Sequence, residues 1–281
     1  MQCEDGGGMR DLRVATYEAG AEGLHLVGRH PSLAAASAAL PEGAYTTLRT
    51  YAGRGVVRLE QHRRRLEDSV GLQGRPGAID PAALRRAIGA VLDEAGHAES
   101  RLRLTFAPPR LFLAIEPFAP LPRRLYEEGV ACVTLDLQRE NPHAKDTRFI
   151  ATADGAYGRL PAGVEEGLIV SGDGAILEGL SSNFFAVLDG TLRTEEERAL
   201  AGVTRSLVLE VAEGLLPIEQ RGIHRDELPR TVEAFLTSVS REVLPVVRLD
   251  SRPVGDGRPG EKTQAIVRAF ADVVRREAER L

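Results

Sequence analysis

The chain has 281 residues, of which 43% are apolar and 27% are charged, and it carries a net charge of −5. This length allows one large domain or two smaller ones. The acidic balance argues against nucleic-acid binding, and no stretch approaches the ~20 apolar residues of a membrane helix. The six histidines show no spacing typical of a metal site.

The basic residues are distributed unevenly between the two types. Only two of the 36 lysine and arginine residues are lysines, Lys145 and Lys262. Compositional drift explains a general shortage of lysine, because arginine serves equally well in solubility and ion pairing. Arginine cannot replace a lysine that reacts as a neutral amine, because a guanidinium does not deprotonate. Lys145, in mid-sequence, is therefore a candidate for chemistry, whereas we interpret Lys262, before the last helix, as a surface residue.

The N-terminal segment and the cysteines bear on cellular location. Residues 1–10 are acidic and glycine-rich, which predicts a disordered tail and is not typical of a signal or transit peptide. The two cysteines, Cys3 and Cys132, form no disulfide framework. Both observations favour a cytoplasmic protein.

Strand and helix patterns predict an N-terminal α+β domain over residues 11–117. Strands are expected at Leu12–Tyr17, Leu24–Val27, Gly43–Tyr51, Arg101–Phe106 and Leu111–Glu116. Helices are expected where Leu59, His62, Leu66 and Val70 recur at helical spacing, and over Leu84–Ala95 after Pro81. The cluster Arg63-Arg64-Arg65 lies beside acidic residues, so we interpret it as a solvated helix face.

A proline-rich segment divides the chain. Three prolines within Pro117–Pro122 exclude a helix or sheet there, so we place an interdomain linker at residues 118–125. The second domain, residues 126–281, is expected to contain a buried strand at Gly129–Leu135 and helices near Val203–Gly214 and Lys262–Leu281. Two such domains favour a site in the cleft between them.

Two segments of the second domain carry candidate catalytic groups. Lys145 lies between a strand end at Pro142 and a helical run, so its amine can point into a cleft. A desolvated lysine has a lowered pKa and becomes a nucleophile able to form a Schiff base, although a surface lysine is the alternative. Glu178 precedes a small-polar turn and an apolar strand. It is either a partner for a protonated ring nitrogen or an ordinary turn acid, whereas Asn183 is expected to fix the loop.

Two further segments are suited to anions. A glycine turn leads into a helix at Val203 and Thr204, where unpaired backbone N–H groups and the helix dipole favour negative charge. The alternative is a helix capped by Thr204. A Ser/Thr-rich turn containing Val239 and Ser240 connects two strands and offers further donors, or is only a connection.

In this order, the four segments resemble those of the class IV aminotransferases, which are fold-type-IV pyridoxal-phosphate enzymes. This family includes branched-chain aminotransferases, D-amino-acid transaminases and aminodeoxychorismate lyase. The resemblance runs from about Gly43 to Thr263 and includes the segments Arg58–Ser69 and Gly255–Gly260. It implies a two-domain α+β fold, with a small N-terminal α/β sandwich and a larger C-terminal pseudo-barrel that binds pyridoxal 5′-phosphate. It also implies a homodimer.

The resemblance implies roles for individual residues. Lys145 matches the Schiff-base lysine and Glu178 the acid on the pyridine nitrogen. Arg58 matches the phosphate-binding arginine. The remaining matches are the phosphate-binding helix start at Val203 and Thr204, and the turn Val239 and Ser240, which reaches the phosphate and the substrate carboxylate. The family often has a hydroxyl at the position of Val239, which retains only its backbone N–H.

The substrate site is less constrained by the sequence. Arg101 and Arg103 alternate on one strand face, so they either clamp a substrate carboxylate or face solvent. Tyr45 matches a pocket aromatic of the family. Arg49 lies four residues later on the same strand face, where it either reaches substrate or forms a buried ion pair. Ile150 replaces a tyrosine typical of branched-chain aminotransferases, which weighs against a strict branched-chain enzyme.

Three functions remain open from the sequence. The first is a transaminase that moves an amino group between an amino acid, of the branched-chain or D type, and a 2-oxo acid. The second is 4-amino-4-deoxychorismate lyase, which releases pyruvate without an amino acceptor. The third is a non-catalytic relative without cofactor, against which the intact set of Lys145, Glu178 and Arg58 argues.

Overall fold

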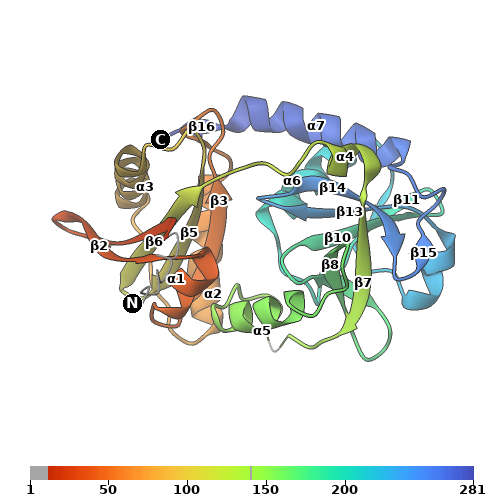
Figure 1. The fold of residues 1–281 in the computed structure, drawn as a ribbon, viewed down its shortest axis with the longest axis horizontal. Helices are drawn as coiled ribbons and strands as arrows, with labels where there is room; N and C mark the ends of the chain where they lie inside the picture. Colours follow the sequence, from red (N-terminus) through yellow and green to blue (C-terminus); the bar gives the residue numbers. More distant parts are fainter. Residues whose placement is uncertain (1–11, 140) are drawn as a thin grey trace, which may run out of the picture.

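The computed structural model describes residues 12–139 and 141–281, and the tail predicted at residues 1–10 lies outside this range. Two β-sheets, one from each half of the chain, form the body of the protein (Figure 1). The five-stranded sheet uses residues up to Pro117, and the nine-stranded sheet begins at Val130. The predicted linker at residues 118–125 therefore falls between the two sheets.

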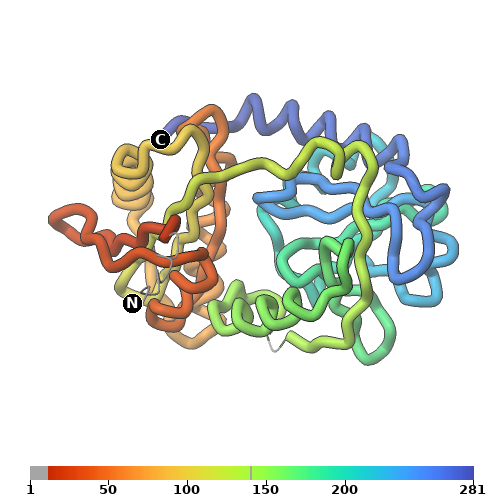
Figure 2. The backbone as a smooth tube through the Cα atoms, viewed as in Figure 1, coloured from red at the N-terminus to blue at the C-terminus, as the bar shows by residue number. Residues whose placement is uncertain are grey.

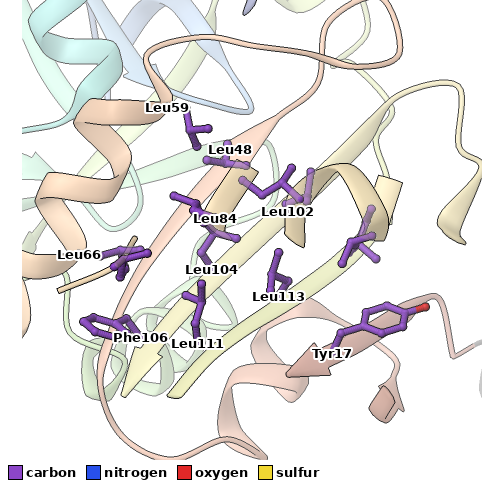
Figure 3. Close-up of a cluster of buried hydrophobic side chains, with 14 of the residues drawn as sticks. Tyr17, Leu48, Leu59, Leu66, Leu84, Leu102, Leu104, Phe106, Leu111 and Leu113 are labelled. Atoms are coloured by element: carbon purple, nitrogen blue, oxygen red, sulfur yellow. The ribbon is translucent and has the colours of Figure 1, made fainter. Parts of the chain in front are cut away.

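The first sheet has the strand order β2-β1-β6-β5-β3 and is antiparallel throughout. Its strands are β1 (Val14–Gly20), β2 (Gly23–His30), β3 (Ala44–Arg49), β5 (Ser100–Ala107) and β6 (Arg110–Pro117). The helices of this half are α1 (Leu33–Ala38), α2 (Leu59–Leu72) and α3 (Pro81–Ala95). Leu66 from α2 and Leu84 from α3 join Leu104 and Phe106 from β5 in one buried cluster (Figure 3). Burial of this apolar face fixes the helices on the sheet.

The second sheet closes on itself, because β9 pairs with both β8 and β10. The strand order is β12-β11-β10-β13-β14-β7-β8-β9, with β15 beside β14. The strands are β7 (Val130–Asp136), β8 (Val164–Val170), β9 (Ile176–Gly179), β10 (Asn183–Leu188), β11 (Thr191–Arg193), β12 (Ile218–Glu219), β13 (Thr231–Ser238), β14 (Glu242–Leu249) and β15 (Arg252–Pro253). The helices are α4 (Arg124–Glu128), α5 (Arg148–Tyr157), α6 (Val203–Ala212), the 3-10 helix η1 (Arg225–Arg230) and α7 (Glu261–Glu277). The α+β fold with a pseudo-barrel is confirmed.

The last helix is shorter than the sequence predicts. Its apolar spacing favoured a helix to Leu281, but α7 ends at Glu277 and the chain continues as β16 (Glu279–Arg280). This strand pairs with β4 (Gly55–Val56), and Arg54 Nε donates to the carbonyl oxygen of Leu281 at 2.5 Å. These contacts replace the last helical turn, and Figure 2 shows the chain end returning to the first half of the molecule.

Two smaller observations concern the described part of the chain. None of its helices has the length and apolar character needed to cross a membrane. Cys132 on β7 is buried as a free thiol, as a small apolar side chain in a strand would be.

Candidate active site

A cavity of about 790 Å³ lies between the two sheets and is lined by residues from both. It brings together most of the residues singled out in the sequence: Tyr45, Arg101, Arg103, Lys145, Glu178, Val203, Thr204, Val239 and Ser240. Arg49 and Arg58 do not line it. The cavity therefore unites segments that lie far apart in the chain.

Lys145 lies in the loop between β7 and α5, and backbone pairing with the first sheet holds this loop. The carbonyl oxygen of Lys145 accepts a hydrogen bond from the Tyr45 N–H at 2.8 Å, and its own N–H donates to Ser69 Oγ at 3.1 Å. The N–H of Thr147 donates to the carbonyl oxygen of Gly43 at 3.0 Å. The loop thus extends the edge of β3, which fixes the lysine backbone on both sides.

The amine of Lys145 sits in a cationic environment. Burial lowers the pKa of Lys145 well below its ordinary value, and the guanidinium groups of Arg65 and Arg139 lower this pKa further. Glu178 opposes the shift but does not outweigh it. A lowered pKa favours the neutral amine, which is the form that acts as a nucleophile or as a base.

Glu178 lies near the end of β9, in a buried ion pair. Its carboxylate accepts hydrogen bonds from Arg139 Nη1 at 2.7 Å and from the backbone N–H of Leu200 at 3.1 Å. Only 5% of its side-chain surface and 9% of that of Arg139 are exposed. Arg139, which the sequence did not single out, also lines the cavity and lies over the ring of Phe149. The pair presents a fixed carboxylate to the cavity.

The start of α6 faces the cavity without a side-chain cap. Gly202 occupies the N-cap, so the alternative in which Thr204 caps the helix is wrong. A Cβ atom on Gly202 would lie 2.1 Å from Asn183 Oδ1, and Asn183 Nδ2 donates to the carbonyl oxygen of Leu200 at 2.8 Å. Asn183 therefore fixes this loop, as expected. The first backbone N–H groups of α6, at Val203 and Thr204, are left for an anion.

Arg58 does not line this cavity, so its assigned phosphate role stays a prediction. It adopts a left-handed backbone conformation before α2, and its guanidinium pairs with Glu210 on α6 and Glu277 on α7 at 2.7 Å and 2.5 Å. Two carboxylates thus neutralise its charge at the junction of three helices. In this structure its guanidinium is paired with carboxylates and not directed to the cavity.

Arg65 lines the cavity instead. It bonds to Thr46 Oγ1, and its Nη2 lies 3.4 Å from Nδ1 of His62, one helical turn earlier. It forms no ion pair with any described carboxylate, and burial lowers its pKa to about 10, so it stays charged at neutral pH. The interpretation of residues 63–65 as a solvated face is therefore wrong for Arg65. The signal was its i,i+3 spacing from His62 on the buried side of α2.

The candidate substrate-binding residues Arg101 and Arg103 on β5 differ in their ion-pair partners. Arg103 lies over the ring of Tyr45 and donates to Ser37 Oγ at 3.1 Å, but it pairs with no described carboxylate. Arg101 pairs with Glu116, and its Nε donates to that carboxylate at 2.6 Å. Both arginines line the cavity, as a role in substrate binding requires. Arg103 is the better anion ligand, because its charge is not already satisfied.

Arg49 forms the ion pair that was the alternative to a substrate role. Its guanidinium contacts Glu99 at 3.1 Å and Glu242 at 3.2 Å, between the rings of Tyr51 and Phe118. Glu242 follows the turn that carries Val239 and Ser240. Arg49 therefore joins the first sheet to this turn and does not bind substrate directly.

A family model described as amino-transferase class IV matches residues 43–249, which is most of the chain. The protein is a class IV aminotransferase family member. The cavity, with its lysine, its buried acid and its anion sites, lies between the sheets that this matched segment builds. The resemblance inferred from the sequence is confirmed at the level of the family.

Individual relatives of this class IV family member come from several organisms. A branched-chain-amino-acid aminotransferase from Pseudomonas aeruginosa is 32% identical over 164 residues, which cover 54% of this chain and 52% of the relative. The chain thus spans about half the length of the curated relatives it matches. Among solved structures, 4-amino-4-deoxychorismate lyase from Pseudomonas aeruginosa is 30% identical with a TM-score of 0.68, covering 82% of this chain and 90% of the lyase.

A second solved structure bears on the fold. The branched-chain amino acid aminotransferase from Escherichia coli has a TM-score of 0.76 at 22% identity. The match covers 94% of this chain and 96% of that one. At this identity the likeness supports the shared fold.

Proposed function

We propose that this class IV family member is a pyridoxal-phosphate-dependent aminotransferase. The observation that carries the proposal is a buried lysine with a lowered pKa, 4.7 Å from the Tyr45 ring, in one cavity with a buried carboxylate. The cofactor fits this cavity by charge, because Arg65 and the uncapped start of α6 offer donors that no described carboxylate uses. Arg65 Nε is buried without a hydrogen-bond partner.

Each side chain has a stated task in this proposal. Arg65 and the N–H groups of Val203 and Thr204 hold the phosphate. Glu178 would hold a proton on the ring nitrogen of the cofactor, and Lys145 would hold the cofactor through Nζ. When bound, pyridoxal phosphate supplies an aldehyde carbon and a ring that accepts negative charge.

Lys145 would have a second task with a substrate amino acid in the cavity. Its lowered pKa favours the neutral Nζ, which would take the Cα proton of the substrate as a base. A guanidinium cannot perform this transfer because it has no accessible neutral form. Burial, and then the charges of Arg65 and Arg139, lower the pKa of Lys145 and so favour the neutral amine that a base requires.

The substrate is an α-amino acid in this proposal, and its acceptor is a 2-oxo acid. The tip of the β13–β14 hairpin, Val239–Ser240, lines the cavity and is assigned to the substrate carboxylate. Arg103 is available for a second carboxylate, such as that of glutamate or 2-oxoglutarate. Tyr45 packs against both Lys145 and Arg103 and forms the wall between these sites.

A half-reaction screen tests the proposal. Purified protein loaded with pyridoxal phosphate is mixed with single L- and D-amino acids of the branched-chain and dicarboxylic types, and the cofactor absorbance is followed. Aminotransferase activity predicts loss of the aldehyde-form absorbance with the true donor and its return on adding a 2-oxo acid. If no amino acid changes the spectrum of the loaded protein, the proposal fails.

The second candidate is 4-amino-4-deoxychorismate lyase. It is favoured by one observation, the 30% identity to a solved lyase across 82% of this chain. The lyase requires the same lysine and carboxylate, so the site alone does not distinguish the two activities. Release of pyruvate from aminodeoxychorismate without an added acceptor identifies the lyase, whereas a strict need for a 2-oxo acid identifies the transaminase.

The remaining expectations concern assembly and location. We propose a homodimer in the cytoplasm, as the family implies. The edge strand β2 exposes Leu26 and Val27 by 54% and 47%, which supports an association surface there. Sedimentation of the wild-type protein and of a Leu26→Ser/Val27→Ser variant tests the dimer. A non-catalytic relative is identified by a purified protein that binds no pyridoxal phosphate.

A further inference from the structure

The tip of the β13–β14 hairpin is a strained loop that is also held by contacts from outside the hairpin. Ser238 pairs with Glu242, which leaves a loop of residues 239–241 between the strands. Glu242, the residue that follows this loop, adopts a left-handed conformation with φ 54°. For a residue other than glycine, such a conformation costs about 1–3 kcal/mol. The loop therefore depends on contacts from outside the hairpin.

Arg241 supplies such contacts on the barrel side. Its Nε donates to Glu165 Oε1 at 3.2 Å, and its Nη1 donates to Ser181 Oγ at 2.9 Å and lies 3.4 Å from Glu166 Oε2. Its backbone is also bound, because its N–H donates to Ser238 Oγ at 3.2 Å and its carbonyl oxygen accepts from Tyr126 at 3.0 Å. One residue thus ties the tip to β8 and to the turn after Glu178.

The anchor of this arrangement is Glu166, which is fully buried. Its carboxylate accepts hydrogen bonds from Ser182 Oγ at 2.9 Å and from the Gly167 N–H at 3.1 Å, so its position is fixed. A Cβ atom on Gly179 would lie 2.9 Å from its side chain, so Glu166 packs closely against the glycine. Arg241 therefore pairs with a rigid partner.

Arg241 differs from the proposed anion-binding arginines, Arg65 and Arg103, because carboxylates already neutralise its charge. Two carboxylates, Glu165 and Glu166, neutralise it, whereas Arg65 and Arg103 pair with no described carboxylate. A guanidinium satisfied in this way is a poor ligand for a substrate anion. Although Arg241 also lines the cavity, these ion pairs assign it to holding the tip.

The opposite side of the tip is held by the first sheet. Glu242 pairs with Arg49 at 3.2 Å, and Arg101 Nη1 lies 3.5 Å from Ser240 Oγ. The tip is thus fixed between an ion pair to the barrel and an ion pair to the first sheet. Loss of one ion pair leaves the other ion pair in place. We therefore expect the fold to survive such a loss while the donors at Val239 and Ser240 move.

We propose that Arg241 is a positioning residue that sets the Val239–Ser240 donors for the carboxylate of the substrate. The inference rests on the proposed function, because the carboxylate role of the tip belongs to it. It predicts that Arg241 governs substrate binding more than the chemical step. It also predicts that the affinity for the cofactor, which the proposed function assigns chiefly to Lys145, Arg65 and the start of α6, changes less than substrate binding.

The test uses the protein loaded with pyridoxal phosphate and 4-methylvalerate, an aliphatic carboxylate that has no amine to react. Arg241→Gln is expected to raise the dissociation constant of 4-methylvalerate and the KM of the amino donor about tenfold, a loss of about 1.4 kcal/mol. The effect on kcat is expected to be smaller. Arg241→Lys, which keeps a charge beside Glu166, recovers part of the binding. Calorimetry and steady-state kinetics give these values.

Two controls separate positioning from a general loss of structure. Arg110→Gln removes an exposed pair with Glu18 on the first sheet and leaves substrate binding unchanged. Glu166→Gln/Arg241→Gln removes both buried charges, so it is expected to melt near the wild-type temperature and still bind 4-methylvalerate weakly. The inference is overturned if the double variant binds 4-methylvalerate with wild-type affinity. It is also overturned if Arg241→Lys and Arg241→Gln both bind it with wild-type affinity. An inactive wild-type protein instead overturns the proposed function.

Discussion

The backbone N–H of Tyr45 donates to the carbonyl oxygen of Lys145 at 2.8 Å, and Nζ of the same lysine lies 4.7 Å from the Tyr45 ring. These two contacts join β3 of the first sheet to the loop after β7 of the second. The lysine is therefore placed by both halves of the chain. A shift between the sheets moves the amine relative to Glu178, so the reacting geometry depends on their packing.

The first prediction concerns Lys145. Lys145→Arg is expected to abolish transamination and to leave the fold intact, because arginine keeps the charge and length but has no accessible neutral amine. Borohydride reduction of the loaded wild-type protein, followed by peptide mapping, should place the adduct on Lys145. The chain offers its own control, since Lys262 is exposed and is the other lysine. Label on Lys262, or activity in the variant, contradicts the mechanism.

The second prediction separates two arginines of one helix segment. Arg65→Met is expected to weaken pyridoxal-phosphate binding about 10- to 100-fold, because charge-assisted hydrogen bonds contribute about 1.5–3 kcal/mol. Arg58→Met removes the pairs with Glu210 and Glu277 and is expected to leave cofactor affinity within about twofold. Fluorescence titration of the apoproteins measures both. Weaker binding in Arg58→Met alone would restore the sequence-based assignment.

The contrast between these arginines shows where sequence reasoning works and where it fails. Lys145 and Glu178 were predicted because their chemistry is tied to residue type and to position along strands and turns. Arg58 was expected beside the phosphate, but from a left-handed backbone its side chain extends toward α6 and α7 and lies outside the cavity. A sequence pattern does not encode that rotation. Arg65 carried a local signal, its helical spacing from His62, but the run of three arginines obscured it.

The chain end illustrates a second limit of prediction from sequence. Apolar spacing correctly identified α7 through Val274, which is buried against the barrel. The residues after Glu277 have the composition of a helix, but they pair with β4, more than two hundred residues earlier. Long-range strand pairing overrides local propensity in such short segments. The closed barrel was likewise predictable from family resemblance and not from strand patterns alone.

The third prediction concerns the buried pair of Arg139 and Glu178. Arg139→Gln leaves an unpaired carboxylate in the interior and is expected to destabilise the protein by about 3–5 kcal/mol. The double variant Glu178→Gln/Arg139→Gln removes both charges. Its loss of unfolding free energy should be smaller than the sum of the losses in the two single variants. Urea unfolding of the apoproteins, analysed as a double-mutant cycle, measures the coupling. Additive effects would show that the two side chains are energetically independent.

The fourth prediction tests Arg103 as the ligand of a second carboxylate. Arg103→Met is expected to raise the KM for 2-oxoglutarate about tenfold or more, while the KM for 2-oxo-4-methylvalerate changes little, since only the first acceptor has a distal carboxylate. Arg110→Met is the control, because Arg110 lies on the same sheet and pairs with Glu18 at the surface. Equal effects on the two acceptors would assign Arg103 to the carboxylate that both share.

The fifth prediction concerns the dependence of stability on pH through His62. This residue is buried, and its Nδ1 lies 2.7 Å from Thr46 Oγ1. Burial lowers the pKa of His62 well below its ordinary value, and the charges of Arg65 and Lys145 lower it further. The unfolded chain binds a proton below about pH 6.5, whereas the folded protein does not. Stability is therefore expected to fall as the pH drops through this range.

Proton linkage sets the size of this effect, and two histidine variants test it. One such group changes the free energy of unfolding by at most about 1.4 kcal/mol per pH unit. His62→Gln retains a polar contact to Thr46 and does not titrate, so its unfolding free energy should change less between pH 7.5 and pH 5. His25→Gln, at an exposed position on β2, should follow the wild type. Parallel curves for the wild type and His62→Gln would exclude His62 as the source of the acid sensitivity.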